Sequence, residues 1–450
     1  MSSPLEGLRI VEMGQLIAIP AAMKMLADMG AQVIRLESCR RLESYRTDSL
    51  FQNDVTGDFW NRGANFYEQN RNKLGITLDL NHPTGLALLR ELISVSDIFA
   101  ENFTPRVIKN FQLEYDDLRQ LNPDIIMVSS TGYGFDGPWA NFGATGPATE
   151  GASGLAYSTG YKNGPPVMSE IPYTDYTGAE HTIFAIMTAL MHRQATGIGQ
   201  FVDVSQTETS TATIPEFLMD YTVNNRVIPR NGNQDPNISP QGCYPCKGND
   251  RWIVISIFND EEWEALCKEL NSPELTSDPR FSNVEGRLKY HDEINVLIAE
   301  VTTRWDNQEL MEVLQTSGIP AGAVLDGQEL LFNQHLQTRN FYEIVPHHPT
   351  TGMPPLPYAS RPWKFSETPQ ITPKSAPIMG EHNKSVFVDL LGYKESALSK
   401  WESEGIIGYG PTTPVGVRRP SLEEQVRQGR LQRFEPDFIN QVSKFHRANE

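Results

Sequence analysis

Three neighbouring stretches decide the fold: LRIVEM (8–13), PAAMKMLADMG (20–30) and QVIRLE (32–37). The first and third are short apolar runs with the length of strands. The middle stretch has Pro at its start and Gly30 at its end, as helices often do. A strand, a helix and a strand in this order predict a βαβ unit.

The same alternation continues through the first third of the chain. HPTGLALLRELISVSD (82–97) has Leu and Ile at helical spacing and precedes DIFAEN (97–102). DDLRQLNP (116–123) likewise precedes the apolar start of DIIMVSSTGYG (124–134). Strands that alternate with helices predict an α/β fold, with a parallel sheet, helices on its faces and right-handed connections. Ligands of such sheets bind at the carboxyl ends of the strands, so we expect the site there.

Composition narrows the class of partner. The formal net charge of −18 disfavours nucleic acid, because binding phosphate backbones needs a basic surface. No run of ~20 apolar residues is present, and the start lacks the basic and apolar regions of a signal peptide. We therefore expect a cytoplasmic protein that does not engage a membrane. The four cysteines are too scattered for a disulfide framework: Cys39, Cys243, Cys246 and Cys267.

The segment PYTDYTGAEH (172–181) is the strongest candidate for chemistry. It follows a long Gly- and Pro-rich loop, and an apolar stripe predicts a helix from about Thr177 to Arg193. Asp175, just ahead of that helix, has two interpretations. It is a helix cap whose oxygen accepts a backbone N–H, or a carboxylate nucleophile held where free N–H groups stabilise an anion. One residue can be both.

Ten segments occur in a fixed order along the chain: LEGLRIVEMG, ADMGAQVIRLE, RNKLGITLDL, AENFTP, SSTGYGFDGPW, TDYTG, RQATGIGQFVDVS, DPRFSNVEGR, GIPAGAV and GEHN. Their order and spacing resemble the class III CoA-transferases. This CaiB/BaiF group includes formyl-CoA transferases and carnitine CoA-transferases. The resemblance runs from about Leu5 to about Leu398. Each segment alone is a weak signal, but ten in order are a strong one.

The resemblance implies that Asp175 is the acyl-carrying nucleophile of a CoA-transferase. Its carboxylate would attack a donor acyl-CoA, for which succinyl-CoA is one candidate, and form a mixed anhydride. The CoA thiolate would then make an aspartyl thioester, from which the acceptor acid takes CoA through a second anhydride. An ordinary Asp pKa near ~4 would leave the nucleophile ionised without a general base. Coenzyme A, as acyl-CoA, is thus the expected cofactor, with no metal.

The resemblance also implies CoA contacts. RNK (71–73) is similar to the segment that holds the nucleotide end of CoA, although solvated surface charge explains it equally well. Asn102 belongs to the N-F-x-P motif, after which this sequence departs from the family: Arg106 replaces a Gly and Lys109 follows. The expected CoA-binding residues are Ile17, Arg40, Arg71, Asn72, Lys73, Asn102, Arg106, Lys109, Thr131 and Tyr133.

Two departures from the formyl-CoA transferases bear on which carboxylic acid is the substrate. Ile17 stands where they have Gln, and NISPQGCYPC (237–246) stands where they have a four-glycine loop over oxalate. We therefore expect a bulkier, less polar acid, such as a carnitine-like, aryl or substituted-succinate carboxylate. The aromatic residues that would line its pocket, or equally pack against the core, are Trp139, Phe142, Tyr157 and Tyr161.

Two other functions stay as alternatives. An α-methylacyl-CoA racemase of the same superfamily would pair the Asp with a His. That position holds Thr145, and no His lies between His82 and His181. A non-catalytic subunit of a heteromeric CoA-transferase is disfavoured by the presence of the nucleophile. The CxxC at 243–246 is weak evidence for zinc or redox chemistry, because no second Cys pair or His pair accompanies it.

The family fold has a large Rossmann-like domain and a smaller α+β domain, in an interlocked, ring-like dimer. Polar, Pro-rich passages at 224–250 and 340–375 would be the crossings between domains. The expected partner is a second copy of the chain, or a related subunit in a heterodimer. The predicted parts are the start of the large domain (1–224), the small domain (225–339), the return to the large domain (340–404) and an extension (405–450). Whether that extension wraps a partner or moves freely stays open.

Overall fold

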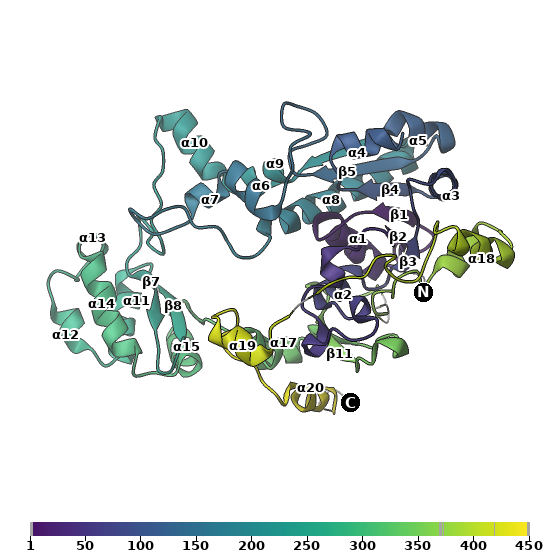
Figure 1. Cartoon of the computed structure of the whole chain (residues 1–450). Coiled ribbons are helices and arrows are strands. Elements are labelled where there is room, and N and C mark those ends of the chain that lie inside the picture. Colours follow the sequence, from purple (N-terminus) through teal and green to yellow (C-terminus); the bar gives the residue numbers. More distant parts are fainter. Residues whose placement is uncertain (1–2, 369–370, 372, 418, 448–450) are drawn as a thin grey trace. The chain divides into compact units, whose positions relative to one another are not determined.

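The computed structural model describes residues 3–368, 371, 373–417 and 419–447. The chain falls into two compact units, and Figure 1 labels most of their elements. Unit 1 comprises Met1–Leu155, Ser169–Pro215 and Thr338–Glu450, and unit 2 comprises Ala156–Met168 and Glu216–Gln337. Unit 2 therefore takes in a short piece of the Gly- and Pro-rich loop as well as the stretch around the predicted small domain.

Unit 1 is built on a six-stranded sheet in which every neighbouring pair of strands is parallel. The strand order is β3-β2-β1-β4-β5-β6, the order of doubly wound nucleotide-binding folds. The predicted α/β fold with a parallel sheet is thus confirmed. The strands are β1 (Arg9–Met13), β2 (Gln32–Glu37), β3 (Leu74–Thr77), β4 (Ile98–Glu101), β5 (Ile126–Thr131) and β6 (Phe201–Ser205).

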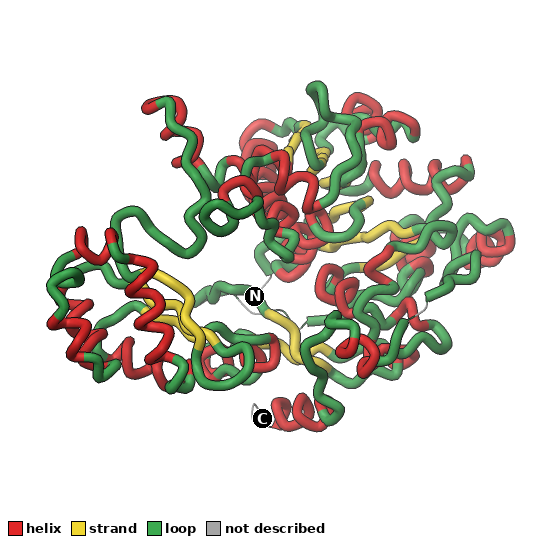
Figure 2. Tube along the Cα trace, turned by 60° about the vertical axis from the view of Figure 1, so that its left-hand side comes forward, coloured by secondary structure: helices red, strands yellow, loops and turns green. Residues whose placement is uncertain are grey.

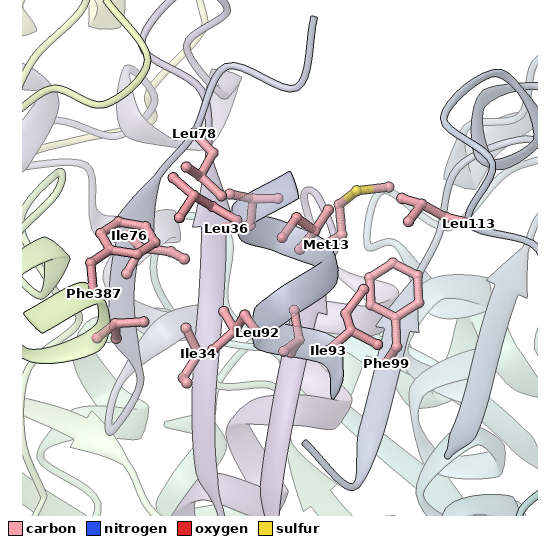
Figure 3. Close-up of a cluster of buried hydrophobic side chains, with 14 of the residues drawn as sticks. Met13, Ile34, Leu36, Ile76, Leu78, Leu92, Ile93, Phe99, Leu113 and Phe387 are labelled. Atoms are coloured by element: carbon pink, nitrogen blue, oxygen red, sulfur yellow. The ribbon is translucent and has the colours of Figure 1, made fainter. Parts of the chain in front are cut away.

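Two hydrophobic cores cover the two faces of this sheet, because successive residues of a strand point to opposite sides. Ile10 belongs to the core that includes helices α1 (Ala18–Asp28) and α8 (Tyr173–Thr196), whereas Val11 belongs to the other core. Figure 3 shows the second core, where Leu92 and Ile93 pack on the strands. Both faces are therefore buried, and only the edges and strand ends are left for a site.

Helices flank the strands of unit 1 (Figure 2). Besides α1 and α8, they are α2 (Ala64–Asn70), α3 (Pro83–Ser94), α4 (Pro105–Asn110), α5 (Tyr115–Leu121), α6 (Gly146–Ala152), α9 (Gln206–Thr211), α18 (Glu395–Ser403), α19 (Leu422–Arg427) and α20 (Phe438–Arg447). Helices α7 (Leu155–Ser158), α10 (Pro215–Asn224) and α17 (Gln334–Thr338) begin in one unit and end in the other. A β10–β11 hairpin (Tyr342–Val345 and Leu356–Ala359) completes the regular elements of unit 1. Short 3₁₀ turns span Ser44–Arg46, Phe51–Asn53, Phe59–Asn61 and Pro349–Thr351, and a π-helical turn spans Ser385–Leu390.

Unit 2 has an antiparallel sheet of β7 (Gln241–Pro245), β8 (Trp252–Ser256) and β9 (Ala321–Ala323). Its helices are α11 (Asp260–Glu269), α12 (Pro273–Ser277), α13 (Val284–Lys289), α14 (His291–Thr302), α15 (Asn307–Thr316) and α16 (Gly327–Leu331). The CxxC cysteines lie in and just after β7, and both are free thiols. Among the described residues, no three His, Cys, Asp and Glu side chains are arranged to hold a metal ion.

The segment after residue 384 folds back onto unit 1. Phe387 belongs to the core in Figure 3, and Trp401 packs beside it with ring centroids 5.7 Å apart. Further on, the N–H of Thr412 donates to Cys39 O at 2.9 Å, and Asn53 Nδ2 donates to Pro420 O at 2.8 Å. The described part of the predicted extension therefore lies along the β2–α2 connection of its own chain; Arg418 and 448–450 are outside the described residues.

No helix in the described part of the chain is both long and apolar enough to cross a lipid bilayer.

Candidate active site

The carboxyl edge of the sheet has a switch point between β1 and β4, on either side of which the strand numbering runs in opposite directions. Crevices form at such points in open α/β sheets. Asn102, directly after β4, spans this one. Its Oδ1 accepts the N–H of Gln15 and its Nδ2 donates to Gln15 O, both at 2.9 Å. The amide of this predicted CoA contact is thus bound to the turn that follows β1.

Helix α1 begins at this turn without a cap of its own. Its N-cap residue is Ile17, another predicted CoA contact, whose buried apolar side chain offers no acceptor. Pro20 lies in the first turn, slightly inside the helix start, where a residue without an N–H is tolerated. The N–H groups of Ala18 and Ile19 therefore need acceptors from elsewhere, and the helix dipole favours an anion.

Asp175 supplies that anion. It lies in the first turn of α8, a 24-residue helix whose N-cap is Pro172. The predicted helix start near Thr177 is thus too late, and Asp175 is not the N-cap of its own helix. Its carboxylate accepts the backbone N–H of Ala18 instead. A side chain of α8 therefore caps α1, and the first turns of both helices stabilise its negative charge.

Burial changes the acidity of this carboxyl group. Removal from water raises the pKa of Asp175 from 3.8 to about 6, and the hydrogen bond from the N–H of Ala18 opposes only part of that rise. The expectation of an ordinary pKa is therefore wrong. No Lys, Arg or His forms an ion pair with Asp175 among the residues that the structure describes. At neutral pH the group is still mostly ionised, in a partly desolvated setting that favours nucleophilic attack.

Buried hydroxyl groups hold the first turn of α8 in place. Thr149 Oγ1 on α6 and Thr174 Oγ1 are 2.7 Å apart, and both side chains are buried. On the next turn, Thr177 Oγ1 lies 3.1 Å from Ser210 Oγ on α9. These contacts tie α8 to two other helices on either side of Asp175, so its backbone has little freedom to move.

The space around Asp175 is narrow. A Cβ atom placed on Gly146 would lie 2.9 Å from Asp175 Oδ2, so only glycine fits there without displacing the carboxylate. Tyr176 accepts a hydrogen bond at its hydroxyl from Gln69 Nε2 at 2.9 Å. Burial, with added effects of Tyr176 and Asp175, raises the pKa of Tyr45 to about 12, so its hydroxyl stays neutral near the carboxylate.

The RNK segment is not surface charge. Arg71 is 2 % exposed, and its Nη2 lies 2.6 Å from Asp28 Oδ2. Asn72 Nδ2 also donates to Asp28, at 2.6 Å. Lys73 is 3 % exposed, with Nζ 2.7 Å from Glu12 Oε2, and burial lowers its pKa to about 7. The solvated-surface interpretation is therefore wrong for Arg71 and Lys73. These side chains are engaged within the fold, and their role toward CoA stays a prediction.

Three predicted cations are exposed at the same edge of the sheet. Arg40 follows β2 and reaches Asp79, with Nε 3.0 Å from Oδ2. Arg106 and Lys109 lie on α4, which follows β4, and both are exposed. Since β2 and β4 flank β1, the carboxyl edge carries positive side chains on both sides of the switch point.

The end of β5 carries the last two predicted CoA contacts. Thr131 is buried, and its Oγ1 has no hydrogen-bond partner among the described residues. Tyr133 packs against Trp139, with ring centroids 5.7 Å apart. Trp139 and Phe142 are half exposed and belong to unit 1. The other two predicted pocket residues, Tyr157 and Tyr161, belong to unit 2.

The histidine that follows Asp175 is His181. It lies six residues along α8, which places it about 240° around the helix axis, away from the carboxylate. Its Nδ1 is bound to Thr177 O at 2.8 Å. Thr145, at the position of the racemase base, is the N-cap of α6 and has no basic group. The geometry of these residues gives the proton-transfer alternative no partner base.

Several residues of this site were not predicted from the sequence. Ala18 acts through its backbone, which no residue pattern reveals. Glu43 and Tyr45 come from an irregular connection, and only the fold brings Glu43 to the turn after β1 and Tyr45 near Asp175. Tyr176 lies within the TDYTG segment, which was an available signal.

The chain is similar to known proteins along most of its length. The sequence profile of CoA-transferase family III matches residues 5–383. The chain is 31% identical over 389 residues to the succinate–glutarate CoA-transferase of Agrobacterium fabrum, covering 86% of this chain and 96% of that protein. It is 30% identical over 404 residues to the succinyl-CoA–D-citramalate CoA-transferase of Chloroflexus aurantiacus, covering 90% and 98%. The crystal structure of a CaiB/BaiF family protein from Brucella suis superposes with a TM-score of 0.79 at 26% identity, covering 87% of this chain and all of that one. The chain therefore belongs to CoA-transferase family III, the class III or CaiB/BaiF CoA-transferases.

Proposed function

We propose that this class III CoA-transferase moves CoA from succinyl-CoA to a bulkier carboxylic acid, with Asp175 as the carrier of the acyl group. The observation that supports it is the setting of Asp175. This carboxylate is partly desolvated, carries a pKa of about 6 and touches the N-terminus of α1. Such a group is both nucleophilic and ionised near neutral pH.

The proposed reaction has two matched halves. A carboxylate oxygen of Asp175 attacks the thioester carbon of succinyl-CoA, the C–S bond breaks, and a mixed anhydride and CoA thiolate form. The thiolate attacks the aspartyl carbonyl and the anhydride C–O bond breaks. Succinate is released, and an aspartyl thioester with CoA is formed. The acceptor carboxylate attacks this thioester and releases the thiolate again. Finally the thiolate attacks the acceptor carbonyl of the new anhydride, which frees the new acyl-CoA and restores Asp175.

The N–H of Ala18 has a part in the steps in which the aspartyl carbonyl is attacked. In the resting enzyme it binds the carboxylate of Asp175. When the aspartyl carbonyl is attacked, negative charge moves onto its oxygen, and an N–H already aimed there stabilises the charge without reorganisation. The dipole of α1 acts in the same direction.

Other features support the choice of substrates. The two similar enzymes are named for succinate or succinyl-CoA, and their partner acids are glutarate and D-citramalate. D-citramalate is a substituted succinate, one of the acid classes expected from the missing glycine loop. The exposed cations Arg40, Arg106 and Lys109 would hold the phosphates of CoA, against the net charge of −18.

A trapping experiment tests the carrier role. The protein is incubated with succinyl-CoA and then with hydroxylamine, and its peptides are mapped by mass. We expect a hydroxamate on Asp175 that depends on succinyl-CoA. Activity that survives Asp175→Ala, together with an unmodified Asp175 peptide, would rule the proposal out. Loss of deuterium or tritium from the substrate α-carbon would indicate racemase chemistry instead.

We also propose that the enzyme works as a homodimer, as the resemblance implies. Light scattering on the purified chain tests this. A dimer that transfers CoA without added protein supports the proposal. A chain that is inactive alone and gains activity with a related subunit would favour the heteromeric alternative.

A further inference from the structure

The turn between β1 and α1 contains a residue in an unfavourable backbone conformation. Leu16 has φ +61°, in the left-handed region that side chains other than glycine rarely adopt. Its side chain is 40 % exposed, so packing of the leucine does not hold it there. Something bound to the backbone of this turn must stabilise it.

That contact is made by Glu43. The N–H of Leu16 donates to Glu43 Oε1 at 2.9 Å. The other carboxylate oxygen of Glu43 accepts from Nη2 of Arg35. Arg35 is fully buried, and its Nη1 is held at 2.5 Å by Glu12 Oε1. The ion pair with Arg35 therefore holds the Glu43 side chain in place, so that its Oε1 is a fixed acceptor for the N–H of Leu16.

A second anchor lies one residue earlier, where Asn102 binds both backbone groups of Gln15. The two anchors, one at Gln15 and one at Leu16, fix the chain just before α1 starts at Ala18. The N-cap residue of α1 makes no side-chain hydrogen bond of its own, and the two anchors precede the N–H of Ala18 by three and two residues.

We propose that Glu43 is a positioning residue of the active site: by binding the N–H of Leu16 it holds the β1–α1 turn in the shape that aims the N–H of Ala18 at Asp175. This inference rests on the proposed role of Asp175 as the acyl carrier. The two carboxylate oxygens of Glu43 are engaged by the N–H of Leu16 and by Arg35, so in this proposal Glu43 acts through the turn.

A carboxylate is required here because both neighbours are donors. The N–H of Leu16 and Nη2 of Arg35 each need an acceptor, and the two oxygens of Glu43 serve one each. A glutamine of the same shape has one acceptor oxygen and one NH₂ group. The charged guanidinium would take the oxygen, leaving the NH₂ group against the N–H of Leu16. Glu43→Gln therefore breaks the contact with the turn while it keeps the volume.

The test is a double-mutant cycle between Glu43→Gln and Leu16→Gly. We expect Glu43→Gln to lower kcat by about tenfold or more, with little change in KM for succinyl-CoA, because an oriented donor is lost. The acid limb of the pH–rate profile of Glu43→Gln should move to higher pH, because the hydrogen bond from Ala18 lowers the pKa of Asp175 and the variant weakens that bond. Glycine adopts positive φ without strain, so in the Leu16→Gly background the loss caused by Glu43→Gln should shrink to about threefold or less.

Two further variants separate positioning from simple structural support. Glu12→Gln removes a negative charge from the same Arg35 without touching Leu16, so Leu16→Gly should not rescue it. Glu43→Asp keeps the charge but shortens the reach, so it should show the same rescue and serves if Glu43→Gln does not fold. Equal losses in both backgrounds for the Glu43 variants, or equal rescue of Glu12→Gln, would overturn the proposal.

The trapping experiment distinguishes this failure from failure of the proposed function. If wild-type Asp175 is never modified, the carrier role itself is wrong. If wild-type and Glu43→Gln proteins trap the acyl group on Asp175 at the same rate, the carrier role stands and the positioning role of Glu43 is wrong.

Discussion

Unit 1 buries its carboxylates in two different ways. Glu12 and Glu43 lie in a balanced ion network with Arg35 and Lys73, in which each carboxylate contacts a cation. Asp175 has no ion-pair partner in the described part of the chain; a backbone N–H and the first turns of two helices stabilise its charge. Burial raises the pKa of both Asp175 and Glu43, but only Glu43 has a neighbouring guanidinium, that of Arg35, which opposes the rise. Asp175 lacks such a partner among the described residues, so its carboxylate is left available as a nucleophile. The network thus shapes the site, and Asp175 performs the proposed chemistry.

The largest expected effect is that of removing the unpaired carboxylate. Asp175→Asn should lower CoA transfer by about a thousandfold or more, since an amide cannot carry the acyl group. It should also make the protein more stable at pH 7. The rise in pKa from 3.8 to about 6 means that ionised Asp175 destabilises the fold by on the order of 3 kcal/mol. Turnover assays and thermal unfolding check both parts.

The matched control neutralises a paired carboxylate. Asp28→Asn breaks the ion pair with Arg71, which is buried, so it should lower the melting temperature. If Asp28→Asn and Asp175→Asn shift stability in the same direction, the difference between paired and unpaired carboxylates does not hold.

The next effect is that of unbalancing the network. Lys73→Met leaves Glu12 with one fewer cation in the interior, and we expect a loss of up to about 3 kcal/mol of unfolding free energy. The loss is reduced at pH 7 because burial lowers the pKa of Lys73 to about 7 and leaves the group partly neutral. Chemical denaturation measures it. Lys109→Met, at an exposed position of α4, is the control and should change stability by less than about 0.5 kcal/mol. A Lys73→Met protein as stable as its control would show that Lys73 does not balance the network.

Lowering the pH should reduce activity by protonating Asp175. Its raised pKa predicts that kcat/KM falls by about tenfold per pH unit below pH 6, where an ordinary Asp would still be ionised. For stability the sign is opposite. The destabilisation by ionised Asp175 is fully present above pH 6 and is lost as the pH falls from 6 toward 3.8. The stability difference between wild-type and Asp175→Asn proteins should therefore vanish near pH 4, whereas a constant difference would contradict the raised pKa.

The smallest expected effect is that of filling the space beside the Asp175 carboxylate. Gly146→Ala brings a methyl group to 2.9 Å from Asp175 Oδ2, so kcat should fall by about tenfold while the helix is not destabilised. Gly151→Ala, on the same helix α6, meets no atom within 4 Å and should keep wild-type turnover. Equal activity of the two variants would mean that the position of the carboxylate is not tightly set.

Much of the fold follows from the sequence because its signals are local. The apolar runs before and after PAAMKMLADMG predict β1 and β2, and the alternation predicts the parallel sheet. Boundaries were less accurate. Helix α8 starts at Tyr173 rather than near Thr177, because the apolar stripe marks the buried face and not the first turn.

The site is less predictable because its contacts join distant segments. Asp175 was selected from its own segment, but its acidity depends on burial and on the N–H of Ala18, which α1 and α8 bring together. Lysine is usually found at the surface, yet Lys73 is buried, because Glu12 compensates its charge. No local pattern reveals such pairing, since it depends on which strands become neighbours.

One isotope experiment tests the central claim most directly. The enzyme is allowed a single turnover with succinyl-CoA and an acceptor acid whose carboxylate carries heavy oxygen. The proposed route passes one acceptor oxygen to the carboxyl group of Asp175, because the second anhydride breaks on the acceptor side. We therefore predict heavy oxygen in the Asp175 peptide, and none in the peptide that contains Asp28. Complete transfer of CoA with no heavy oxygen at Asp175 would contradict the account.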